Sequence, residues 1–284
     1  MSASTTAAPA RTGPSFARVV SAEWTKLLGL RSTTVIAVVT VVATGALTFL
    51  FASAASGDPG FVPTRNLTDA LPLAFIGPLV LGVLVGTGEF STGTFRSTFA
   101  AVPRRGPVLA AQVVVTACSV LGIAVLTVAA AVLGILPSAA ARDVDVDLLG
   151  AGAPQILLGS VSFFVGTALL GLAAGALLRR TVPALVTVFG VLPVLPVLLS
   201  LAVDFTTDPL EASTSGTTPP GTAAVNTVET FTPVGAGGVL TTPDGSGLDG
   251  APRLGAAGAT LVLAGWVAVP LAAAAYRLRR RDLV

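Results

Sequence analysis

The chain has 284 residues, of which 53% are hydrophobic and only 11% are charged. Soluble domains carry about 25% charged residues, so this composition excludes an ordinary soluble domain. The net charge is only +2, and no clustered basic stripe indicates nucleic-acid binding. The chain has no His and a single Cys, Cys118, which excludes an internal disulfide, the common zinc and haem ligand sets, and Ser-His or Cys-His catalysis.

Six apolar windows without Asp, Glu, Lys or Arg predict six transmembrane helices, because a span needs about 20 mostly apolar residues. They cover residues 33–57, 71–88, 107–136, 154–178, 182–203 and 254–276. We therefore expect an all-α integral membrane protein, and Pro193 and Pro196 are placed to break the fifth span. Residues 1–14 are rich in Ser, Thr, Ala and Pro, so they are expected to form a disordered tail.

The distribution of basic residues predicts the orientation, because Lys and Arg resist translocation. With both termini in the cytoplasm, only Arg65, Arg142 and Arg253 of the 16 basic residues lie outside. This orientation makes residues 277–284 a basic cytoplasmic tail and residues 204–253 an extracellular loop. The use of one Lys against 15 Arg, with abundant Ala, Val, Gly and Pro, is typical of a high-GC bacterium, so the bacterial cytoplasmic membrane is the expected location.

Residues 15–32 carry apolar side chains at helical spacing, which predicts an interfacial helix on the cytoplasmic surface before the first span. Trp24 and the basic residues would lie at the polar level of the membrane. Glu23 falls within the apolar arc. It either pairs with Lys26 or Arg31 in the same segment or meets another subunit.

The loop of residues 89–106 is the longest cytoplasmic connection and begins with Glu89. Its Ser and Thr residues alternate with Phe90, Phe95 and Phe99. Since Phe95 and Phe99 share a helix face, the pattern predicts a short amphipathic helix that ends before Pro103. Three aromatic residues in a cytoplasmic loop favour a docking role over a solvated connector.

The remaining patterns are less specific. Asp143, Asp145 and Asp147 lack the Gly and Glu of an EF-hand and are interpreted as a solvated acidic turn. Residues 223–240 are modestly apolar and predict a short external or re-entrant helix, whereas the glycine-rich run 235–238 is interpreted as loop. Gly82 with Gly86, and Gly171 with Gly175, would allow close helix packing, by default within one subunit.

The chain lacks an energy source of its own. Its one lysine, Lys26, is not in a phosphate-binding loop, so ATP hydrolysis by this chain is excluded. Proton-driven carriers place acids or His within their spans, and the six windows contain none. Sodium sites built from backbone carbonyls on broken helices stay possible.

Three runs of the sequence resemble the permease subunits of type-2 ABC exporters. They are EWTKLLGLRST at residues 23–33, GEFSTGTFRSTFAAVPRR at 88–105 and YRLRRRDLV at 276–284, in the same order and around the same six-span layout. In that family the loop after the second span forms a coupling helix that sits in a cleft of the ATPase, and an elbow helix precedes the first span. The resemblance implies that Glu89, Phe90, Thr94, Phe95 and Arg96 contact an ABC ATPase subunit, and that the elbow includes Glu23, Trp24, Lys26 and Arg31.

The resemblance further implies an assembly of two permeases and two ATPases, with ATP and magnesium bound by the ATPase and neither cofactor nor metal held by this chain. We expect the permease itself to have no catalytic residue, and its charge-free spans favour an amphiphilic or apolar cargo for export. The alternatives are an ion-coupled secondary carrier and a non-transporting membrane partner of a sensor or enzyme.

Overall fold

The computed structural model describes residues 15–57, 60–92, 105–150, 152–206 and 218–280, and within these ranges the chain forms helices and turns without a strand. The long helices are α2 (Arg31–Ala55), α4 (Ile76–Thr92), α6 (Arg105–Ala140), α7 (Ala153–Leu178) and α13 (Gly255–Arg280). The stretch that corresponds to the fifth predicted window consists of α8 (Thr181–Phe189), the π-helix η2 (Gly190–Val194) and α9 (Leu195–Thr206). Six helical stretches, one for each predicted window, are long and apolar enough to cross a membrane, which confirms the six predicted windows.

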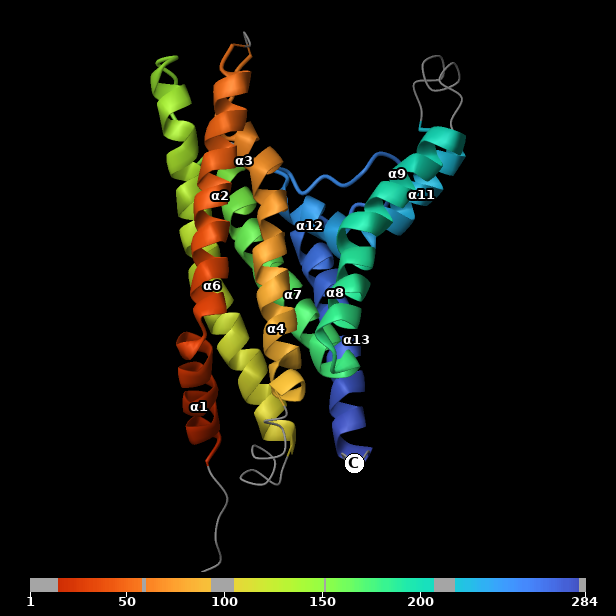
Figure 1. Ribbon diagram of the computed structural model, residues 1–284. Helices are drawn as coiled ribbons and strands as arrows, with labels where there is room; N and C mark the ends of the chain where they lie inside the picture. Colours follow the sequence, from red (N-terminus) through yellow and green to blue (C-terminus); the bar gives the residue numbers. More distant parts are fainter. Residues whose placement is uncertain (1–14, 58–59, 93–104, 151, 207–217, 281–284) are drawn as a thin grey trace, which may run out of the picture.

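Five shorter helices complete the described chain: α1 (Phe16–Gly29), α3 (Arg65–Ala70), the 3-10 helix η1 (Leu71–Phe75), α11 (Pro220–Thr230) and α12 (Pro233–Thr241). Figure 1 shows α1 below α2, at the same end of the bundle as the last turn of α13. We call this the α1 end, and the end at which α3 lies the α3 end. The first described helix and the end of the last one thus lie at the same end of the bundle, as an even number of spans requires.

Four glycines bring α4 and α7 into backbone contact. A Cβ atom added at Gly82 or Gly86 would collide with the carbonyl oxygens of Ala168 or Leu172 in α7. In the opposite direction, a Cβ at Gly171 or Gly175 would collide with the backbone of α4. The prediction that these two glycine pairs pack within one subunit is confirmed, and the two pairs pack against each other.

The contact between α2 and α6 also uses small residues. Thr40, Thr44 and Thr48 form a buried row on α2, and each hydroxyl donates to the carbonyl oxygen four residues earlier at 2.7–2.8 Å. These hydroxyls are therefore satisfied without water. Gly134 of α6 lies against the backbone of Gly45, where a Cβ atom would come within 2.6 Å of the carbonyl oxygen.

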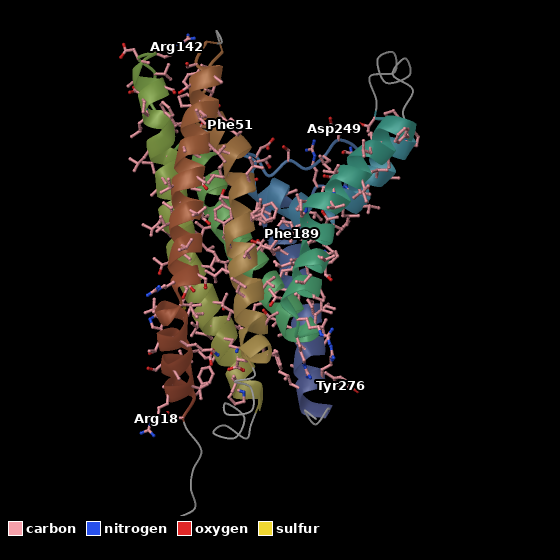
Figure 2. All side chains as sticks on the ribbon, viewed as in Figure 1. Arg18, Phe51, Arg142, Phe189, Asp249 and Tyr276 are labelled. Carbon is pink, nitrogen blue, oxygen red and sulfur yellow. The ribbon has the colours of Figure 1, made fainter. Side chains whose placement is uncertain are left out.

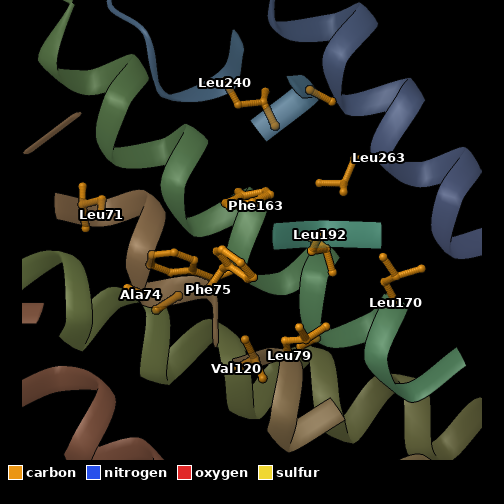
Figure 3. Packing of buried hydrophobic residues seen from close by; sticks show 14 of the residues in the cluster. Leu71, Ala74, Phe75, Leu79, Val120, Phe163, Leu170, Leu192, Leu240 and Leu263 are labelled. Atoms are coloured by element: carbon orange, nitrogen blue, oxygen red, sulfur yellow. The ribbon is translucent and has the colours of Figure 1, made fainter. Parts of the chain in front are cut away.

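The core lies where η1, α4, α7, η2 and α12 meet. Phe75 and Phe163 pack with ring centroids 5.8 Å apart, in a tilted arrangement that aromatic pairs favour. Figure 3 shows these rings among Leu79, Leu192 and Leu240, which are buried and come from three further elements. Helices distant in sequence therefore share one apolar centre.

The fifth span is interrupted, as its prolines predict. Pro193 lies inside η2 and cannot donate a backbone hydrogen bond, which explains why the regular α-helical pattern gives way to a π-helix there. Beyond this point α9 diverges from the bundle together with α11 (Figure 1). Few side chains of the span are buried, and Val182, Val186 and Phe205 are exposed, as lipid-facing side chains of a membrane protein would be.

Helices α11 and α12 form a hairpin between the last two spans. The interpretation of residues 235–238 as loop is wrong, because they lie within α12. Their small size has a packing role, since a Cβ atom at Gly237 would collide with the ring of Phe163. The indole nitrogen of Trp266 donates to the carbonyl oxygen of Phe231 in the hairpin turn at 2.8 Å, which places the turn beside the middle of α13. The hairpin therefore enters the bundle, which favours the re-entrant alternative.

Charged side chains lie at both ends of the bundle. Figure 2 labels Arg18 and Tyr276 at the α1 end, and Arg142 near the tip of α6 at the α3 end. Asp143, Asp145 and Asp147 follow Arg142 in an exposed turn, where Asp147 accepts from two backbone N–H groups, at 3.1 Å from Leu149 and 2.8 Å from Gly150. These contacts agree with the expected solvated acidic turn.

Replacing Gly82 by Ala tests the contact of α4 with α7. The added methyl group must displace the carbonyl of Ala168, so we expect the mutant to be destabilised by about 1–3 kcal/mol. Gly122→Ala on the exposed face of α6 is the matched control, because nothing lies within 4 Å of its added Cβ. Thermal unfolding in detergent should show a lower midpoint for Gly82→Ala alone, and equal midpoints would contradict the packing.

Candidate functional site

Helix α1 is held against the first turns of α6. Val19 and Leu27 are buried on the face of α1 that packs on α6, and Val19 contacts a small cluster with Val108 and Ala111. Glu23 lies between them at the four-residue spacing of a helix face, so it is buried as well, with 8% of its surface exposed. The packing therefore places the carboxylate of Glu23 in the contact between α1 and α6.

Lys26 joins α1 to the end of α4. Its ammonium group lies 3.0 Å from the carboxylate of Glu89 and 3.7 Å from that of Glu23. Glu89 has only 3% of its side chain exposed, whereas 41% of Lys26 is accessible. Gln112 of α6 is buried and donates its side-chain amide to Glu23. We call Glu23, Lys26, Glu89 and Gln112 the Lys26 cluster.

Burial and the neighbouring groups of the Lys26 cluster shift the pKa of Glu23. Burial raises the pKa of Glu23 above its ordinary value of 4.5. Lys26 and the hydrogen bond from Gln112 lower this pKa, and the neighbouring charge of Glu89 raises it, but the cost of burial is the largest of these effects. The ammonium group of Lys26 therefore lies within 4 Å of two buried carboxylates, and burial favours the neutral form of Glu23.

A second set of contacts holds the same end of α4 to α7 and α8. The hydroxyl of Thr181, the first residue of α8, donates to the hydroxyl of Thr87 at 3.0 Å, and Thr87 donates to the carbonyl oxygen of Val83 at 2.8 Å. The guanidinium of Arg179 lies over the ring of Phe90, 5.2 Å from its centroid, at cation–π distance. Arg179 is the C-cap residue of α7 and has a left-handed backbone conformation, with φ 59°. Its backbone N–H donates to the carbonyl oxygen of Gly175.

Helix α13 is joined to this region through Arg277. The guanidinium of Arg277 donates to the carbonyl oxygen of Leu177 in the last turn of α7. Leu172, Ala274 and Leu278 form an apolar cluster beneath these polar contacts, with Phe90 packed against it. The final turn of α4 is therefore in contact, directly or through α7, with α1, α6, α8 and α13.

This arrangement can transmit a displacement. The residues that follow α4 in the sequence are attached to a helix end whose neighbours are fixed by ion pairs, hydrogen bonds and backbone contact. Such an end is expected to move with its neighbours as a unit, because close-packed interfaces do not deform continuously. No group of three or more His, Cys, Asp or Glu in the described ranges is arranged to hold a metal ion.

The sequence-predicted residues divide into three groups. Glu23, Lys26, Glu89 and Phe90 lie in or beside the contacts above, and the pairing of Glu23 with Lys26 that the sequence offered as one alternative is present. Trp24 is 39% exposed and Arg31, the first residue of α2, is exposed, so neither joins the Lys26 cluster. Thr94, Phe95 and Arg96, and with them the expected coupling helix, lie outside the described residues.

Sequence reasoning did not find the pairing of Lys26 with Glu89, nor the parts of Gln112 and Arg179. One signal was available, because Lys26 is the only lysine and Glu89 the only carboxylate at the end of the second predicted span. Each residue had a plausible separate role, so their contact needed the position of α1 beside α4. No protein-family model matches the chain, and a search of curated proteins returned no match.

Replacing Glu23 by Gln tests its environment through pH. The groups that face Glu23 are Lys26 on α1, Glu89 on α4 and Gln112 on α6. Because its pKa is raised in the fold, the folded state binds more protons than the unfolded state just above the ordinary value. The contribution of Glu23 to stability is therefore full below about pH 4.5 and is lost as the pH rises through the raised pKa.

The thermal midpoints of the wild-type chain and of Glu23→Gln are measured in detergent from about pH 4 to about pH 8. As the pH rises, the midpoint of the wild type should fall relative to that of the mutant. Asp145→Asn, in the exposed turn at the α3 end, is the control and should show no such trend. A difference that does not vary with pH would contradict the assignment.

Proposed function

We propose that this chain is the membrane-spanning permease subunit of an ATP-driven ABC transporter, an exporter energised by a separate ATPase subunit. The observation that carries the proposal is the position of the contacts around the end of α4. They surround the point at which the chain enters residues 93–104, the segment in which the resemblance to type-2 ABC exporters is most extensive. The six apolar helices supply the membrane domain that such a subunit needs.

In this proposal, the α1 end faces the cytoplasm and both termini lie inside a bacterial cytoplasmic membrane. The excess of basic residues in the segments at this end supports the orientation. Phe95 and Arg96 would dock into the ATPase together with Thr94, while Glu89 and Phe90 would act mainly within the permease. Their burial supports this division, since Glu89 is almost fully covered and Phe90 packs against the cluster that contains Leu172.

ATP-driven closure of the ATPase would then displace the end of α4. The ion pair of Lys26 with Glu89 would carry the displacement to α1, and the hydrogen bond from Thr181 to Thr87 would carry it to α8. Alternating access would result from rigid-body motion of the spans, with no covalent step in this chain. ATP and magnesium would be bound by the ATPase, and a second permease copy would complete the pathway.

The resemblance and the contacts favour this function over the two alternatives. An ion-coupled carrier would need a gradient rather than ATP, and a non-transporting partner would need no path for cargo. The interrupted fifth span with Pro193 is the one observation that a carbonyl-based carrier would also use. ATP-dependent, vanadate-sensitive transport in reconstituted vesicles would separate the first function from both others.

The double mutant Phe95→Ala with Arg96→Ala tests the docking assignment. Removing one aromatic anchor and one charge should lower co-purification with the ABC ATPase subunit that the proposal requires by at least about tenfold, since anchors of this kind each contribute more than about 1 kcal/mol. Insertion of the mutant into the membrane should be unchanged. Asp145→Asn, at the α3 end, should co-purify as the wild type does, and undiminished co-purification of the double mutant would remove the docking assignment.

A further inference from the structure

An apolar cleft of about 660 Å³ lies between α7, the fifth span and α13. Leu170 and Leu177 of α7 line one side, and Val188 and Val191 of the fifth span line another. Trp266 lines the cleft on the α13 side. The volume is in the range of sites that hold a small organic ligand, and no lining residue is charged.

The lining offers no free hydrogen-bond donor to a ligand. Among the lining residues, only Thr187 and Trp266 carry a polar side-chain atom. The hydroxyl of Thr187 donates to the carbonyl oxygen of Pro183 at 2.9 Å. The indole nitrogen of Trp266 donates to the carbonyl oxygen of Phe231 at 2.8 Å. A charged or polar group placed in the cleft would lose its hydration without gaining a donor, which is costly, so the lining favours a hydrocarbon chain.

The cleft extends over the depth of one leaflet of a bilayer. The hydrogen bond from Trp266 to Phe231 lies beside the middle of α13. The hydrogen bond from Arg277 to the carbonyl oxygen of Leu177 marks the level at which α7 ends, at the α1 end. Eleven residues of α13 separate Trp266 from Arg277, or about 16 Å along the helix axis. Half of a bilayer's hydrocarbon core is about 15 Å thick, so an acyl chain in the cleft would reach from the polar level at the α1 end to the membrane centre.

The turn between α11 and α12 bounds the cleft at the membrane centre, where Phe231 lines it. This turn is fixed to the bundle. Thr232 caps α12 by accepting from the N–H of Gly235 at 3.0 Å. Helix α12 lies in backbone contact with α7, since a Cβ atom at Gly159 would collide with the carbonyl oxygen of Leu240. The cleft therefore has a closely packed wall at its central end.

We propose that this cleft binds one acyl chain of a membrane phospholipid from the leaflet on the α1 side, with the terminal methyl group of the acyl chain beside Trp266. The uncharged lining, the satisfied polar atoms and the length of the cleft each support this occupant. A cleft with walls from three helices buries more of an acyl chain than the outer surface of a single span does. The bound lipid is therefore held more tightly than the lipid around the protein, and the acyl chain rather than the headgroup determines its affinity.

This inference goes beyond the proposed function, because lipid binding requires neither ATP nor an ATPase. A test on the purified permease alone therefore separates the two. Loss of docking in the Phe95 and Arg96 double mutant would leave lipid binding intact. Absence of lipid binding would leave the ATPase docking untouched.

The experiment uses phosphatidylcholine that carries bromine on one acyl chain, because bromine quenches tryptophan fluorescence at short range. The protein has two tryptophans, so Trp24→Phe leaves Trp266 as the single reporter. In a steroid-based detergent, which has no alkyl chain, we expect bromine near the terminal methyl group to quench Trp266 in a saturable manner. Bromine near the ester should quench it far less at saturation. Phosphatidylglycerol with the same brominated chain should bind with the same affinity.

Gly265→Leu fills part of the cleft, and Gly122→Leu is the matched control. Nothing lies within 4 Å of an added Cβ at either glycine, but only Gly265 lines the cleft. Gly265→Leu should weaken lipid binding at least about tenfold, because the acyl chain loses the burial of several methylene groups. Gly122→Leu should bind the lipid as the parent does. Equal thermal midpoints of the two variants would show that both fold.

A second variant guards against a folding defect in Gly265→Leu. Val269 lines the cleft and is exposed, so Val269→Phe should fold and weaken lipid binding as well. Quenching that rises in proportion to the lipid without saturation would overturn the proposal, as would unweakened binding to folded Gly265→Leu or Val269→Phe. Tighter binding of phosphatidylglycerol than of phosphatidylcholine would overturn it too, because the headgroup would then determine the affinity.

Discussion

The contact on which the rest of this structure depends is the ion pair between Lys26 and Glu89. A carboxylate with 3% of its side chain exposed is costly unless neighbouring groups compensate its charge, and Lys26 does so from a separate helix. The pair requires α1 to lie beside the end of α4. The packing of α1 on α6, where Val19 and Leu27 are buried, holds α1 in that position. The position of α1 and the covered end of α4 are two consequences of one electrostatic requirement.

Helix α4 packs on α7 with the two backbones in direct contact. The backbone contacts at Gly82, Gly86, Gly171 and Gly175 leave no side-chain layer between the two helices. The fifth span has the opposite character, since η2 interrupts it and few of its side chains are buried. The bundle thus combines a closely packed pair, α4 with α7, and a fifth span with little buried surface. Relative motion of these two parts is what alternating access would require.

The sequence predicted what depends on local composition and missed what depends on distant contacts. Charge-free windows located all six spans, and glycine spacing located the contact of α4 with α7, because both follow from the cost of placing groups in lipid or between helices. The pairing of Lys26 with Glu89 joins residues 63 positions apart, so no local pattern could encode it. The division of this region into α11 and α12 was not predicted, because residues 223–240 were expected to form one short helix and the glycine-rich run 235–238 was interpreted as loop. The flanking prolines, Pro220 and Pro233, are each at the start of a helix and were the available signal.

Cysteine cross-linking in native membranes tests the central claim most directly. In a Cys118→Ser background with Lys26 and Glu89 intact, cysteines at positions 19 and 108, whose buried valines pack together where α1 meets α6, should be joined by a short bifunctional thiol reagent. Cysteines at positions 53 and 138, where the hydroxyls of Ser53 and Ser138 lie 3.3 Å apart between α2 and α6, provide the matched control. The account predicts that both pairs cross-link within single chains. Cross-linking of the 53 and 138 pair without the 19 and 108 pair would contradict it.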